Sequence, residues 1–294
     1  MAPTPIPGVR SSLRTVVNGR PRQDRDALVA LYNGTGGANW RGNRNWLTEQ
    51  PLGQWYGVTT DHTGRVTRLS LEENNLVGTL PPELGNLTSL EQVYLDGNEL
   101  TGTIPPELGR LARLDWLGLS GNRLTGAIPS EFGNLANLEG LGLGGNELAG
   151  TIPPELGKLD GLHDLWLGGN NLTGAIPPEL GNLCSLAWLG LGDNNLTGVV
   201  PPELGNLHNL ETLSLENNAL TGPLPLSLAG LERIDQLSYL NTELCVPDDE
   251  ALRAWLESLR VHRGTGVPCT PGTGHRPDQG HAARAGDGRD GCGR

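Results

Sequence analysis

Residues 98–135 read NELTGTIPPELGRLARLDWLGLSGNRLTGAIPSEFGNL, and the pattern in this stretch returns every 24 residues between about residues 66 and 242. Such self-similarity is typical of one short unit stacked many times, each copy burying its apolar side against its neighbours. The sequence therefore predicts a solenoid of about seven repeats and a degenerate eighth. Leucine, asparagine, glycine and proline each keep a fixed phase, in columns that begin Leu71, Leu95, Leu119; Asn74, Asn98, Asn122; Gly78, Gly102, Gly126; and Pro81, Pro105, Pro129.

Each copy contains a short L-x-L segment, the pattern of a strand with one buried face. The asparagine follows where the chain turns, and its amide can bond backbone groups of adjacent turns. Ordering the 24 residues of one copy costs roughly 1–2 kcal/mol each in backbone entropy. About eight buried aliphatic side chains return roughly 1.5–3 kcal/mol apiece. One copy alone falls short of stability, so the repeats must stack.

The composition changes at both ends of the repeats. We expect residues 1–22 to be disordered and residues 23–65, rich in tryptophan, to cover the first repeat as an N-terminal cap. The repeats fill residues 66–242. Residues 243–269 predict a C-terminal cap, with a helix capped by Asp248 that buries Leu252, Trp255, Leu256 and Leu259. The Gly- and Arg-rich residues 270–294 predict a disordered tail.

The stretch 98–135 resembles the plant-type leucine-rich repeat, known from ectodomains of plant receptor-like kinases and from polygalacturonase-inhibiting proteins. The segment from DALVALYNGTGGANW to GRVTRLSL, residues 26–71, is similar to caps of related bacterial and algal repeat proteins, and it lacks the cysteine pair of plant caps. The resemblance implies an α/β solenoid: a curved horseshoe with a parallel sheet on the concave face, 3₁₀ turns on the convex face and helical caps. It implies a receptor-like or signalling role in binding. The alternative is inhibition of a secreted polysaccharide hydrolase.

Charge narrows the choice of partner. The formal net charge is −12, which disfavours nucleic acid and anionic membrane surfaces. No stretch approaches the ~20 apolar residues of a membrane helix. We expect a monomer that binds a protein, peptide or glycan, without membrane insertion, and we expect no cofactor.

The cysteines and the N-terminus leave the compartment open. Cys245 and Cys269 flank the C-terminal helix and can pair, which would imply an oxidising compartment. We expect Cys184 to be a free buried thiol and Cys292 to lie in the tail. Residues 1–22 contain no apolar run of signal-peptide length, which taken literally indicates the cytoplasm. The family resemblance instead implies an extracellular or cell-surface protein.

Strand residues between the leucines point to the concave face, because side chains alternate across a strand. Glycines occupy these outward positions in one repeat, with tryptophans in the repeats on either side. Since neighbouring strands are ~4.8 Å apart, Trp116 and Trp166 would flank a glycine-floored trough roughly 10 Å wide. Acidic residues around it favour a cationic or hydroxyl-rich partner. The predicted ligand-binding residues are Tyr94, Asp96, Trp116, Gly140, Gly142, Gly144, Asp164, Trp166, Trp188 and Asp193.

Catalytic motifs are weak. His163 beside Asp164, with Glu139 one repeat earlier, is the best acid–base candidate, but the sequence places no nucleophile near it. The G-x-G-x-x-G match at residues 140–145 lies along a repeat strand, whereas the dinucleotide fingerprint needs a strand-to-helix turn. No Cys/His spacing fits a zinc site. We therefore predict a protein without enzymatic activity, and an enzyme using His163 and Asp164 is the weakest alternative.

Overall fold

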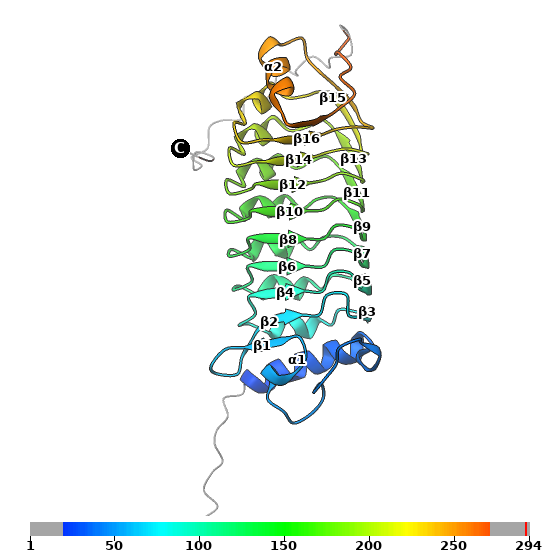
Figure 1. The fold of residues 1–294 in the computed structure, drawn as a ribbon, viewed down its shortest axis with the longest axis vertical. Helices are drawn as coiled ribbons and strands as arrows, with labels where there is room; N and C mark the ends of the chain where they lie inside the picture. The colour runs from blue at the N-terminus through cyan, green and yellow to red at the C-terminus, as the bar shows by residue number, and fades with distance from the viewer. Residues whose placement is uncertain (1–19, 271–291, 293–294) are drawn as a thin grey trace, which may run out of the picture.

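The computed structural model describes residues 20–270 and residue 292, and it is an elongated stack of repeats with a helix at each end (Figure 1). The stack carries one long sheet whose strands pair in parallel, except for an antiparallel β1–β2 pair at the N-terminal end. Its solvent-exposed side is called the concave face below. This ten-stranded sheet contains β1 (Val58–Thr60), β2 (Val66–Ser70), β4 (Gln92–Tyr94), β6 (Trp116–Gly118), β8 (Gly140–Gly142), β10 (Asp164–Trp166), β12 (Trp188–Gly190), β14 (Thr212–Ser214), β16 (Gln236–Ser238) and β18 (Val261–Arg263).

A second, eight-stranded set lies where each repeat turns away from the first sheet. It consists of β3 (Val77–Thr79), β5 (Glu99–Thr103), β7 (Arg123–Gly126), β9 (Glu147–Gly150), β11 (Asn171–Gly174), β13 (Asn195–Gly198), β15 (Ala219–Pro223) and β17 (Glu243–Cys245). A 3₁₀ turn then returns the chain in each repeat, and these turns are η3 (Pro82–Asn86), η4 (Pro106–Arg110), η5 (Ser130–Asn134), η6 (Pro154–Lys158), η7 (Pro178–Asn182), η8 (Pro202–Asn206) and η9 (Leu226–Gly230). The predicted solenoid is confirmed.

Leucines from all three sides of the repeat fill one continuous core. Leu141, Leu165 and Leu189 pair in register along the long sheet and are fully buried. Phe132 replaces the usual leucine of the 3₁₀ turn and is equally buried. The apolar side of each strand therefore has no exposed surface left except at the two ends of the stack.

The periodic asparagines join consecutive repeats through their side chains. Asn170 donates from Nδ2 to the carbonyls of Leu143 and Leu167, at 3.0 and 2.9 Å, and its Oδ1 accepts from the Leu148 amide at 3.0 Å. The same bonds recur at Asn98, Asn122, Asn146, Asn194 and Asn218. Each side chain is nearly buried, so it satisfies backbone groups that water cannot reach.

The N-terminal cap seals the first repeat with aromatic rings. Helix α1 (Arg20–Gly34) packs against η3, and the short turns η1 (Gly37–Asn39) and η2 (Leu52–Gln54) follow it. Trp40, Trp46 and Trp55 are buried and contact one another in series. The helix begins before the predicted boundary at residue 23, so the expectation of disorder is wrong for residues 20–22. Residues 1–19 lie outside the described part of the chain.

The C-terminal cap uses a different capping residue from the one predicted. Helix α2 (Glu250–Ser258) is capped by Asp249, whose Oδ1 accepts from the Leu252 amide at 2.8 Å. Asp248, the predicted cap, instead pairs with Arg253 at 2.6 Å. Leu252 and Leu256 are buried as expected. Within residues 20–270, neither helix is both long and apolar enough to cross a membrane.

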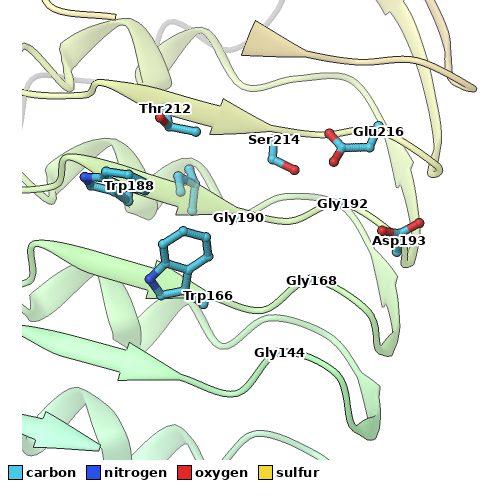
Figure 2. Close-up of a pocket in the computed structure, with 11 residues that line it drawn as sticks. Gly144, Trp166, Gly168, Trp188, Gly190, Gly192, Asp193, Thr212, Ser214 and Glu216 are labelled. Carbon is cyan, nitrogen blue, oxygen red and sulfur yellow. The ribbon is translucent and has the colours of Figure 1, made fainter. Parts of the chain in front are cut away.

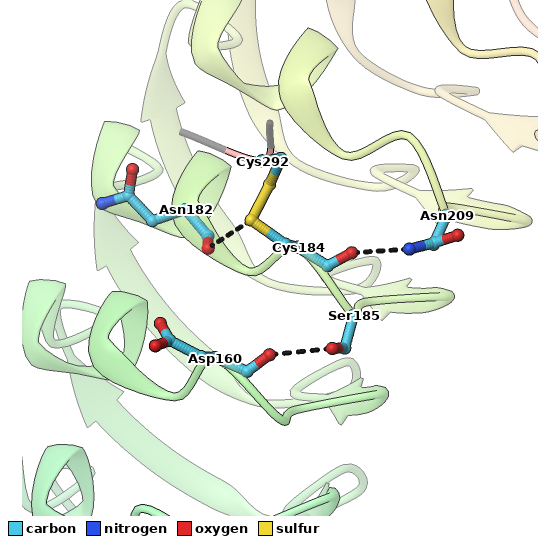
Figure 3. Close-up of a disulfide and its surroundings, with 6 residues drawn as sticks. All are labelled: Asp160, Asn182, Cys184, Ser185, Asn209 and Cys292. Carbon is cyan, nitrogen blue, oxygen red and sulfur yellow. Dashed lines mark hydrogen bonds between the residues drawn. A yellow bond between two sulfur atoms is a disulfide. The ribbon is translucent and has the colours of Figure 1, made fainter. Parts of the chain in front are cut away.

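Two disulfides are present in the structure. Cys245 and Cys269 are joined across the C-terminal cap. Cys184 is bonded to Cys292, so the expected free buried thiol at Cys184 is wrong. It is only half-buried, because it lies on the turn that follows η7, where Asn209 donates a hydrogen bond to its carbonyl at 2.8 Å (Figure 3). The rest of the predicted tail, residues 271–291 and 293–294, lies outside the described residues.

Replacing Asn170 by alanine should destabilise the stack, since it leaves the Leu148 amide and two buried carbonyls without their side-chain partner. Unsatisfied buried groups cost about 1–3 kcal/mol each, so we expect the free energy of unfolding to fall by at least about 2 kcal/mol in urea titrations. Asn171→Ala is the matched control, because the adjacent Asn171 is exposed. Equal losses in both variants would contradict a structural role for the asparagine column.

A thiol count tests the two disulfides. Protein denatured without reductant should present no free thiol, since all four cysteines are paired. Reduction should lower the free energy of unfolding, because closing a loop as long as that between Cys245 and Cys269 stabilises by about 3 kcal/mol. A Cys245→Ser/Cys269→Ser variant should lose the contribution of the Cys245–Cys269 bridge. A Cys184→Ser/Cys292→Ser variant should retain the contribution of that bridge. Four free thiols in the unreduced protein would contradict both bridges.

Candidate functional site

Aromatic side chains form two pairs on the concave face. Tyr94 and Trp116 stack with ring centroids 6.2 Å apart, and the guanidinium of Arg68 lies 4.6 Å from the Tyr94 ring. Trp166 and Trp188, on β10 and β12, lie 5.4 Å apart with their planes tilted by 42°. Trp166 is 39% exposed although it sits in the middle of a sheet. Exposed tryptophan is enriched among binding anchors, so this second pair is the stronger candidate.

The glycines expected to floor an open trough are covered by their neighbours. A Cβ at Gly140 would overlap the ring of Trp116, so that ring lies across β8. A Cβ at Gly142 would come within 3.0 Å of Ser120 Oγ. On the other side, Trp166 leans towards β12, where a Cβ at Gly190 would meet its ring at 3.3 Å. The predicted trough between Trp116 and Trp166 is therefore not where the hollow of this face lies.

A pocket of about 150 Å³ lies further along the stack, between β10 and β14 (Figure 2). We call it the aromatic pocket; Trp166 and Trp188 line one side, and Asp193, Ser214 and Glu216 the other. Four of the predicted site residues line it: Gly144, Trp166, Trp188 and Asp193. Seven further lining residues were not predicted: Gly168, Leu189, Gly190, Gly192, Thr212, Ser214 and Glu216. Most of these residues occupy the same outward positions of the 24-residue repeat as the predicted residues. This shared position in the repeat is the sequence signal that could have identified them.

The acidic side of the pocket has one unusual atom. Oε2 of Glu216 is buried and accepts no hydrogen bond from any described residue. Asp193, by contrast, accepts from Asn217 Nδ2 at 2.6 Å. Asp193 lies just beyond β12 and Glu216 just beyond β14, so the pocket joins an aromatic wall to a negatively charged one.

The remaining predicted residues lie elsewhere on the concave face. The carboxyl of Asp96 lies over Gly118 and accepts from the Ser120 amide at 2.8 Å. Burial raises the pKa of Asp96, opposed by that hydrogen bond. Asp164 contacts His163, with Nδ1 and Oδ2 3.4 Å apart, and His163 is exposed. Tyr94, Asp96, Trp116 and Asp164 therefore do not join the aromatic pocket.

The described part of the chain contains no cluster of side chains suited to binding a metal ion. Within residues 20–270 and Cys292, no three His, Cys, Asp or Glu side chains are grouped so that they could hold an ion. The chemistry that the pocket offers is stacking, hydrogen bonding and negative charge.

Comparison with known proteins places the repeats in a family. Residues 64–124 match one model described as leucine rich repeat, and residues 137–159, 161–183, 185–207 and 209–231 match a second. Over 74 residues the chain is 35% identical to a probable leucine-rich repeat receptor-like protein kinase of Arabidopsis thaliana, which covers 24% of this chain and 7% of that protein.

Two solved structures extend the similarity to the fold. The plant peptide hormone receptor RGFR1 in complex with RGF2 matches 68% of this chain with a TM-score of 0.64 and 34% identity, and the chain spans 34% of that structure. A plant ice-binding protein matches 86% of this chain and 99% of its own, with a TM-score of 0.61 and 25% identity. The chain thus spans about a third of the receptor and almost all of the ice-binding protein. By repeat sequence, repeat geometry and these matches, the chain belongs to the leucine-rich repeat family.

Proposed function

We propose that this chain is a non-catalytic recognition module that binds an extended peptide or protein segment along its concave face. The aromatic pocket is the observation that carries the proposal. A tryptophan left 39% exposed on a rigid sheet loses little conformational entropy on binding, because its backbone and neighbours are already fixed. Its ring offers apolar area, and the flanking carboxylates offer hydrogen-bond acceptors.

Similarity to a peptide hormone receptor supports a peptide over a folded domain as ligand. An extended segment can follow successive strands and place one side chain in each hollow, whereas a pocket of about 150 Å³ is too small for a typical small-molecule ligand. A glycan ring would also stack on Trp166, and failure of every library peptide to bind would leave a glycan as the candidate ligand. The relatives described above lend no support to inhibition of a polysaccharide hydrolase.

Ice binding is a second candidate, favoured by the second sheet. That sheet carries a row of partly or fully exposed threonines at one position of the repeat, interrupted once by Ala149; they are Thr101, Thr125, Thr173, Thr197 and Thr221. Parallel strands are ~4.8 Å apart, so on either side of Ala149 the row presents hydroxyl and methyl groups at regular intervals, as a crystalline surface requires. The charged side chains of Glu99, Arg123 and Glu147 flank it, which makes this the weaker candidate.

Alanine substitution of the pocket tryptophans tests the peptide proposal. Linear peptides selected from a random display library on the whole chain should bind Trp166→Ala and Trp188→Ala at least about tenfold more weakly, because anchor residues carry most of the binding energy. The melting temperatures should change little. Tyr56→Ala is the control, since Tyr56 is 45% exposed in the N-terminal cap. Unchanged affinity, or large losses of stability in both tryptophan variants, would contradict the proposal.

Ice recrystallisation assays distinguish ice binding from peptide binding. If the threonine row binds ice, the chain should slow crystal growth, and Thr173→Lys should abolish the effect by placing a charge within the row. Trp166→Ala should leave it intact. Growth rates equal to those with an inert protein at the same concentration rule this candidate out.

A further inference from the structure

The aromatic pocket combines Glu216, which has one carboxylate oxygen without a hydrogen-bond donor among residues 20–270, with the exposed indole ring of Trp166, and this combination selects one kind of side chain. Resting on the recognition function proposed above, we propose that the pocket receives an arginine side chain of the bound peptide. The guanidinium would donate hydrogen bonds to Glu216 while its plane lies against Trp166. The proposal specifies one residue of the bound peptide, and the other residues of the peptide are unspecified.

One carboxylate oxygen of Glu216, Oε2, is buried without a hydrogen-bond donor from the described part of the chain. A carboxylate oxygen removed from water without a hydrogen-bond donor is costly, and native structures rarely leave one. Among the described residues, the other two buried side-chain atoms without partners, Asp24 Oδ1 and Trp55 Nε1, lie in the N-terminal cap. Of these three residues, only Glu216 lines the aromatic pocket. Within residues 20–270 no basic side chain forms a salt bridge with Glu216, so a cationic ligand group meets no charged competitor from the described chain.

Glycine positions around the pocket hold the two walls in place. A Cβ at Gly192 would come within 2.9 Å of the Glu216 carboxyl, so this carboxyl of the following repeat lies over the glycine. From the preceding repeat, Trp166 leans over Gly190. Glutamate and tryptophan therefore approach the same segment from opposite sides. The two groups that arginine needs are already oriented before a ligand arrives.

The floor of the pocket explains why a side chain, rather than a backbone, would enter it. At Gly144 a Cβ would lie 3.1 Å from the Gly168 carbonyl, and at Gly168 one would lie 3.0 Å from the Gly192 carbonyl. Bare backbone thus lines the base across three repeats. A long, thin side chain can lie along this base without displacing any other group.

Charge and shape favour arginine over lysine. The chain carries a net charge of −12, and Asp193 adds a second carboxylate at the same end of the pocket. A guanidinium is planar, stacks on aromatic faces and presents a fork of donors that matches a carboxylate. An ammonium is a strongly hydrated point charge and would gain less from the indole face.

The experiment uses a peptide recovered from the display library on the whole chain. Recovered peptides should share an arginine, and remaking one with citrulline, which keeps the shape and removes the charge, should weaken binding by about tenfold or more. In a Glu216→Gln variant the arginine and citrulline peptides should bind within about threefold of each other, because the coupling depends on both partners. Glu203→Gln is the matched control, since Glu203 is exposed on η8 and its loss changes the net charge equally.

The outcomes separate this inference from the function on which it rests. Peptides that lack arginine but still lose affinity in Trp166→Ala would overturn the arginine proposal and leave peptide recognition standing. An arginine-to-citrulline ratio unchanged in Glu216→Gln would also overturn it. If no library peptide binds the wild-type chain, both proposals fail.

Discussion

The hydrogen bonds of the buried asparagine column are the interaction on which the rest of the structure depends. Leucine burial alone would stack the repeats, but it would leave amides and carbonyls unpaired wherever the chain turns out of the long sheet. One asparagine side chain reaches both its own repeat and the preceding one, as Asn170 does with Leu167 and Leu143. This fixes the spacing and register of consecutive strands. A rigid concave face follows, and its outward positions are free to vary.

The differences in sequence between the repeats are concentrated at the outward positions of the long sheet. Inward positions repeat leucine almost without exception, whereas outward positions range from glycine to tryptophan. Large residues of one repeat lie across glycines of an adjacent repeat, as Trp116 does over Gly140 and Glu216 over Gly192. The same pairing produces the aromatic pocket, where a stiff backbone holds rings and carboxylates that would be mobile in a loop. Such preorganisation is what a weakly ordered peptide ligand requires.

The fold could be predicted from the sequence because every repeat carries the same signal. Period, strand position and the asparagine turns are all local properties, and they combine in phase over about seven copies. Less periodic features were harder to place. Asp249 rather than Asp248 caps α2, a difference of one residue that depends on where the chain leaves β17. Cys184 pairs with a residue 108 positions away, and nothing local indicates that contact. The alternation of the strand predicts that Trp116 and Trp166 point outward, but it does not predict which neighbouring strand each ring lies across. That choice depends on which neighbour is glycine, so the predicted trough between the two tryptophans was wrong.

The central claim is that ligand recognition takes place at Trp166 and Trp188 on the concave face. Spectra of the ¹⁵N-labelled chain, recorded with and without a bound peptide, test it most directly through the indole N–H resonances. The account predicts that the signals of Trp166 and Trp188 shift on binding, while those of Trp40, Trp46 and Trp55 in the N-terminal cap stay unchanged. Shifts confined to the cap, or to amides of the second sheet, would contradict it.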